Sequence, residues 1–377
     1  MDLTTLGALL VVALGLIGAD TIMHSGSINV EVTPPPQIPG EVIDQATLEA
    51  EFDNQLFQIA KIPSVVSPPD IRTSQDQGLG MTIAQAVNAA SIAYALQTEF
   101  GYAPNQVRLA LYLEHGELRG QISGVDRHVG TFRQVFVPYK DETLLPFVRR
   151  CALWSASQIA PYSTALYLLQ KHSTDQNFTD VFALIDYAKS ELPPTPVSFD
   201  KSVLDNLRGL ALLFENKPSD AQDAFDLAIT EDPSNPVAEI NAAFADLQLD
   251  KYEKGVERMQ SLISDRPPAN KILLMTAYMT WAAAEMGLHN LPEADRLLAL
   301  ATATYPDSAT AFGLWADLKA LQGDQKGADR YAHQAQLNSA TFENYAELAA
   351  LYFRLSWRDN EEVNLNKFSN PSVVSFH

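Results

Sequence analysis

The amino-acid sequence predicts an α+β domain followed by an all-α solenoid of helix pairs, preceded by one N-terminal transmembrane helix. Three observations predict this organisation. Residues 3–19 carry no charge, residues 28–160 mix helical and alternating apolar spacing, and a pattern of small residues returns about every 34 residues in the second half. A chain of 377 residues is also too long for one ordinary core, so we expect two folded units.

The composition describes a folded, acidic protein. Hydrophobic residues make up 46% of the chain and charged residues only 19%, which argues against a disordered chain. The 46 acidic and 26 basic residues give a net charge of −20. Such a surface repels phosphate, which argues against nucleic acid and anionic lipid headgroups as partners. The single cysteine, Cys151, cannot form an internal disulfide.

The N-terminal segment "LTTLGALLVVALGLIGA" is about 17 uncharged residues long, the short limit for a membrane span. With Ile22 and Met23 it extends to a transmembrane anchor over residues 3–23. A cleaved signal peptide and a buried core helix are the alternatives, although "MDLTT" lacks the usual basic n-region. The first basic residue is Lys61, so no basic loop holds the following chain in the cytoplasm. We therefore expect a single-pass inner-membrane protein with its bulk on the periplasmic side.

Residues 28–160 predict one sheet covered by helices. A short strand at 28–32 precedes a Pro-rich connection, and "DQATLEAEFDNQLFQIA" has helical apolar spacing behind the N-cap residue Asp44. Residues 81–100 predict a second helix. "VRLALYLEHGELRGQISG" alternates and turns at His115-Gly116, which predicts a hairpin, and "TFRQVFVPY" adds a strand. Residues 144–159 predict a closing helix that ends before Pro161.

The stretch "DAQDAFDLAITEDPSNP" is one copy of a repeat. Pro233 is followed by Pro267 after 34 residues, and Ala294 by Ala328 after the same step. The step from Pro267 to Pro306 is 39 residues, and the sequence "PPANK" accounts for an insertion there. Paired helices at this period, with small residues at fixed crossing points, are typical of a helical solenoid.

This pattern resembles the tetratricopeptide repeat (TPR), which has small residues at its eighth, twentieth and twenty-seventh positions and Pro at its thirty-second. The matching residues are Gly209, Ala221, Ala228 and Pro233; Ala243, Gly255 and Pro267; Ala282, Ala294, Ala301 and Pro306; and Ala316, Ala328 and Ala335. We expect the solenoid to span residues 161–357, with a degenerate first copy before Pro193 and a capping helix at 341–357. Residues 358–377 form a C-terminal tail.

The resemblance implies a concave face on which a protein partner binds. The family's groove positions fall here on Asn206, Leu210, Leu213, Ile240, Phe244, Leu247, Met279, Ala283 and Met286. These residues are nearly all apolar, so we expect a groove for a partner helix or extended segment, or a groove that the chain itself fills. Only Asn206 matches the pattern that clamps a peptide carboxylate, which argues against capture of an acidic tail.

Chemical motifs are weak throughout the chain. Gly78 and Gly80 precede a predicted helix and could present N–H groups to an anion, but the other residues of a nucleotide-binding motif are missing. Asp126 and His128 share a loop, and the seven histidines form no metal-binding pair. We expect no metal and no cofactor.

The sequence therefore predicts a non-catalytic, membrane-anchored adaptor whose solenoid docks a protein of a membrane or envelope assembly. One alternative is an α+β domain that senses a small ligand and relays its binding through the solenoid. A weaker alternative is a hydrolase that uses Asp126 and His128.

Overall fold

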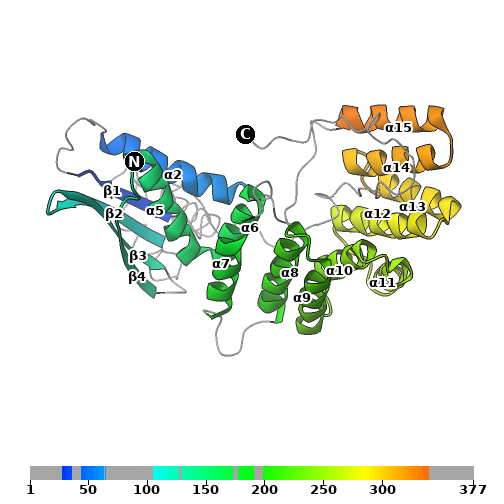
Figure 1. The fold of residues 1–377 in the computed structure, drawn as a ribbon, viewed down its shortest axis with the longest axis horizontal. Coiled ribbons are helices and arrows are strands. Elements are labelled where there is room, and N and C mark those ends of the chain that lie inside the picture. The colour runs from blue at the N-terminus through cyan, green and yellow to red at the C-terminus, as the bar shows by residue number, and fades with distance from the viewer. Residues whose placement is uncertain are drawn as a thin grey trace, which may run out of the picture. The chain divides into compact units, whose positions relative to one another are not determined.

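The computed structural model describes residues 28–35, 44–62, 64, 105–126, 130–172, 177–190 and 198–338 (Figure 1). They form two compact units, with residues 28–62 and 105–167 in the first, and Ser64 and residues 168–338 in the second. The division falls within helix α6, Pro161–Lys171, close to the boundary expected at residue 160. The predicted anchor at 3–23, the helix at 81–100, the cap at 341–357 and the tail lie outside the described residues.

The first unit contains a sheet whose described strands follow the order β1-β2-β3-β4. The strands are β1 Ile28–Thr33, β2 Asn105–Glu114, β3 Glu117–Asp126 and β4 Gly130–Phe136. β1 pairs parallel with β2, and the other neighbours pair antiparallel. The β2–β3 turn places His115 and Gly116 at φ 53° and 83°, the left-handed geometry of a tight hairpin turn. This confirms the predicted hairpin.

Two helices, α2 Gln45–Ala60 and α5 Leu144–Ile159, pack with the sheet in one hydrophobic core. The Asp44 carboxylate accepts a hydrogen bond of 2.7 Å from the Thr47 amide, so the predicted N-cap is confirmed. The side chains that α2 buries are those that its spacing predicts: Leu48, Phe52, Leu56 and Ile59. On the exposed side of the sheet, Arg108 forms an ion pair with Glu31 at 2.7 Å.

The second unit consists of helices. They are α7 Thr179–Ser190, α8 Ser198–Phe214, α9 Pro218–Glu231, α10 Pro236–Gln248, α11 Tyr252–Asp265, α12 Lys271–Gly287, α13 Leu291–Thr304, α14 Ala309–Leu321 and α15 Gln325–Asn338. From α8 onward they form four pairs, and Figure 1 shows these pairs stacked one after another. The second helices begin at Pro218, Tyr252, Leu291 and Gln325, so the steps are the predicted 34, 39 and 34 residues.

The longer step is absorbed between the second and third pairs. α12 is 17 residues long, whereas α10 and α14 have 13 residues each. Asn270 caps α12 by accepting hydrogen bonds from the amides of Ile272 and Leu273. The insertion therefore adds a helical turn and lengthens the preceding loop, and the register of the repeat is unchanged.

Each pair is closed by the same turn. The first helix is followed by a residue with positive φ at an identical repeat position: Asn216 at 58°, Asp250 at 57°, His289 at 58° and Gly323 at 75°. The next amide donates to a carbonyl in the last turn of the helix, as in the hydrogen bonds from Lys217 to Leu212 and from Lys251 to Asp246. Asn, Asp, His and Gly tolerate this conformation better than other residues, which explains the residue types found there.

Small residues bring the paired helices close together, as predicted. A Cβ added at Gly209 would overlap the buried ring of Phe225, and one at Gly255 would overlap Leu247. Ala221 and Ala228 have no exposed surface.

Among the described helices, none is both long and apolar enough to cross a membrane.

Candidate functional site

The nine predicted groove residues lie in the interior of the second unit. All have at most 6% of their surface exposed: Asn206, Leu210, Leu213, Ile240, Phe244, Leu247, Met279, Ala283 and Met286. Five of them belong to one core cluster with residues of α11, α13 and α14. These residues therefore do not form an exposed surface in the structure, and the binding of a partner at them stays a prediction. Removing the apolar surface of these side chains from water stabilises the folded state.

Asn206 is engaged within the solenoid. Its side-chain oxygen accepts a hydrogen bond of 2.8 Å from the Asn241 amide, and both side chains are buried. This contact joins α8 to α10 and satisfies a polar group that would otherwise be costly to bury. Asn206 therefore does not present its side chain to a peptide carboxylate on the surface.

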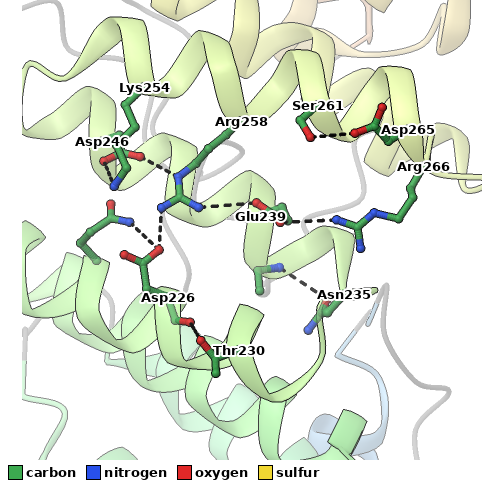
Figure 2. A network of polar contacts seen from close by, with 12 residues as sticks. Asp226, Thr230, Asn235, Glu239, Asp246, Lys254, Arg258, Ser261, Asp265 and Arg266 are labelled. Atoms are coloured by element: carbon green, nitrogen blue, oxygen red, sulfur yellow. Dashed lines mark hydrogen bonds and ion pairs between the residues drawn. The ribbon is translucent and has the colours of Figure 1, made fainter.

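A network of polar contacts joins α9, α10 and α11 (Figure 2). Arg258 on α11 contacts three carboxylates, with distances of 2.5 Å to Asp226, 2.8 Å to Asp246 and 3.5 Å to Glu239. Lys254 lies 3.2 Å from the second oxygen of Asp246, as an ion pair without hydrogen-bond geometry. We call these five residues, with Arg266, the Arg258 network.

Burial alone would lower the pKa of the Arg258 guanidinium, but the charges of Asp226 and Asp246 outweigh burial and raise it. The Asp246 side chain is completely buried and that of Arg258 is 15% exposed. Arg266 adds an ion pair with Glu239 at 3.6 Å. The network contains three carboxylates and three cations, so it leaves no net charge to attract an ion. We interpret the Arg258 network as a structural contact that holds the first two repeats together.

The last described repeat carries a cluster of aromatic side chains. Trp315 and Tyr331 stack with ring centroids 4.1 Å apart, and Phe312 lies 6.2 Å from Tyr331. The Trp315 indole donates a hydrogen bond of 2.8 Å to Asp295, which also forms an ion pair with Lys319. The three rings are half-buried, and Leu337 on α15 is 61% exposed. We call Phe312, Trp315, Tyr331 and Leu337 the repeat-4 aromatic surface.

The predicted chemical sites are not assembled by the described residues. Gly78, Gly80 and His128 lie outside them, and Asp126 ends β3, so the anion site and the hydrolase remain predictions. In the described part of the chain, no three His, Cys, Asp or Glu side chains gather as a metal site. Burial raises the pKa of the Cys151 thiol to about 12, so this thiol is not poised as a nucleophile.

The chain matches no protein-family model and no curated protein sequence. Several solved structures resemble its helical half. MamA from Desulfovibrio magneticus RS-1 is 13% identical over 49% of this chain and 98% of its own, with a TM-score of 0.36. PilW, a type IV pilus biogenesis factor, is 17% identical over 48% of this chain and 80% of its own, with a TM-score of 0.40. Pseudomonas aeruginosa PilF is 13% identical over 47% of this chain and 76% of its own, with a TM-score of 0.38.

These three structures are tetratricopeptide-repeat proteins. Because the TM-scores are low, the chain's own geometry carries the assignment of its fold. The helix pairs recur in the 34-residue register, share one left-handed turn and cross at Gly or Ala. The helical unit has the architecture of tetratricopeptide repeats, and the predicted resemblance is confirmed.

Proposed function

We propose that this protein is a non-catalytic adaptor, anchored in a membrane by residues 3–23, whose solenoid docks a protein of a membrane or envelope assembly. The observation that carries the proposal is the stack of four helix pairs in a single register within the described residues. Stacked repeats contact only their neighbours and so build an extended, rigid surface for binding other proteins.

The exposure of the apolar residues in the solenoid supports one proposed docking surface over the others. The predicted groove residues are buried, whereas the repeat-4 aromatic surface presents half-buried rings beside the exposed Leu337. Aromatic side chains at a partly exposed site supply large contact area at low cost in conformational entropy, and they are enriched where proteins bind one another. The proposed docking surface is therefore the last described repeat, and the proposed partner presents an apolar segment.

Site-specific photo-crosslinking in intact membranes tests the proposal. One full-length variant carries a photoreactive residue at Leu337, and a matched variant carries it at Val125, which is 52% exposed on the first unit. We expect the Leu337 probe to crosslink reproducibly to one other protein and the Val125 probe to give only background. Crosslinks from Val125 alone would assign docking to the first unit. Background from both probes would contradict the adaptor function.

The proposed location is tested separately. The uncharged residues 3–19 and the absence of basic residues before Lys61 support an inner-membrane anchor with the remaining chain in the periplasm. We expect the protein to stay in the membrane fraction after carbonate extraction and a C-terminal tag to be digested by protease added to spheroplasts. Release by carbonate, or a tag protected until the inner membrane is lysed, would overturn this location.

A further inference from the structure

The second helix of each described pair exposes one of its sides. We define this side by the second, third, sixth, ninth and tenth residues of α9, α11, α13 and α15, because this spacing puts residues on one side of a helix. All of these residues except Gly327 are exposed or half-buried. We call them the second-helix face. The solenoid presents this face along all four of its described pairs.

The charge of the second-helix face changes sign along the stack. Its sixth position carries Asp223, Glu257, Arg296 and Arg330 in order, and all four residues are exposed. On the whole face, three acids give α9 a charge of −3, and two acids and one lysine give α11 a charge of −1. One glutamate balances one arginine on α13, and two basic residues give α15 a charge of +2, with histidine neutral. The face is therefore acidic at its first repeat and basic at its last.

These charges are accessible to another molecule. Within the described residues, the side chains of Asp223, Glu257 and Arg330 form no ion pair. Arg296 pairs with Glu293 on its own helix at 2.6 Å, and its side chain is still 54% exposed. Exposed charges of this kind steer the encounter of two proteins and fix their orientation.

The complement of this face is the same face turned end for end. A two-fold axis between α11 and α13 sets Glu257 against the partner's Arg296, and Asp223 against the partner's Arg330. The same repeats build both rows, so their spacing matches and the pairs form together. A parallel arrangement brings −3 against −3 and +2 against +2, which is repulsive.

We propose that two copies of this chain associate through their second-helix faces, antiparallel about this axis. Leu227, which is 45% exposed on α9, adds apolar contact beside the charged row. Because the charges lie on an exposed surface, they set the orientation and the salt dependence of the dimer more than its affinity. The proposal does not rest on the adaptor function, because it concerns contacts between copies of this chain.

The molar mass of the purified full-length protein in a mild detergent tests the association. Light scattering after size-exclusion chromatography should find a dimer at low salt. The dissociation constant should rise at about 1 M salt, where the screening length is about 3 Å. A monomer at low salt, up to the highest soluble concentration, would overturn the proposal and leave the second-helix face to a different protein.

Charge reversal tests which face the copies share. Glu257→Arg sets two arginines against each other, and Arg296→Glu sets two glutamates against each other. Each variant should raise the dissociation constant at least about tenfold. Glu117→Arg makes the same charge change at an exposed position of the first unit and should leave the dissociation constant unchanged. A dimer that neither reversal on the face weakens would show that the copies meet elsewhere.

Restoring the opposite charges separates a lost contact from a lost fold. Equal amounts of the Glu257→Arg and Arg296→Glu proteins should form a mixed dimer, because opposite charges meet again at both pairs near the axis. A chain that carries both replacements should dimerise like the original chain for the same reason. A dimer that both single reversals weaken, and that neither the mixture nor the double variant restores, would contradict the two-fold pairing.

Discussion

Replacement of Arg258 by Met should destabilise the solenoid far more than the same replacement at a surface arginine. The Met side chain keeps much of the apolar stem of Arg258 but removes the guanidinium between Asp226, Asp246 and Glu239. Asp246 is completely buried, so its charge would lose its closest partner. Breaking a buried pair in this way costs about 3–5 kcal/mol. Because Lys254 stays 3.2 Å from Asp246, we expect the lower end, about 3 kcal/mol.

The assay is urea unfolding of the full-length protein, followed by far-ultraviolet circular dichroism, which reports mainly on the helices. Arg296→Met is the matched control, because Arg296 is 54% exposed and pairs with Glu293 on the surface of α13. That replacement should cost less than about 1 kcal/mol. Adding Asp246→Leu to Arg258→Met should recover part of the loss, since the buried charge is then removed. Equal losses at Arg258 and Arg296, within about 0.5 kcal/mol, would refute the reasoning.

Three further predictions concern other parts of the chain. Gly209→Ala should destabilise the solenoid by about 1–2 kcal/mol because the added Cβ meets the Phe225 ring. Gly313→Ala has open space around the added Cβ and should stabilise the solenoid by up to about 1 kcal/mol. Both free energies of unfolding are measured in urea, and equal effects would contradict the close approach of the helices at Gly209. A hydrogen bond from Arg150 lowers the pKa of Glu142 in the folded protein below its ordinary value of 4.5. The free energy of unfolding lost in Glu142→Gln should therefore be largest at neutral pH and should disappear as the pH falls through the lowered pKa of the folded state. A loss of the same size in urea unfolding at neutral and at acid pH would exclude this contribution. The buried Cys151 should react with a thiol reagent only when the first unit unfolds, so its labelling in the native protein should be slow. Native protein that is labelled as fast as protein unfolded in urea would show that the thiol is accessible.

Much of the fold could be predicted because its signals are local or periodic. The alternation of Leu109 and Leu111 predicts a strand with one buried face, and both side chains are buried on the helix-covered side. Leu113 continues the alternation but is 38% exposed, because it lies beside the hairpin turn at the end of the sheet. The repeat register could be predicted despite the insertion, because extra residues between two helix pairs do not change how the two helices of each pair cross.

The exposure of the groove residues could not be predicted, because burial depends on what packs against a helix from outside. The groove positions were placed on the correct helices, yet Ile240, Phe244 and Met279 are buried. Spacing within a helix identifies which residues share a face, but it does not show whether water or another segment covers that face. The positive φ residues were also missed. Asn216, Asp250 and His289 do not resemble one another, and only their common repeat position reveals the shared turn.

The sequence by itself determined the strands and most of the helices of the described residues, the 34-residue register and the crossing points at Gly and Ala, since each depends on residues close together or on a repeated spacing. The tertiary structure alone decided which charges pair and which apolar residues are exposed. Arg258 meets Asp226 and Asp246 because three helices stack, and the sequence separations of 32 and 12 residues follow no motif. Such contacts arise from packing between repeats, which fixes distances that local propensity does not encode.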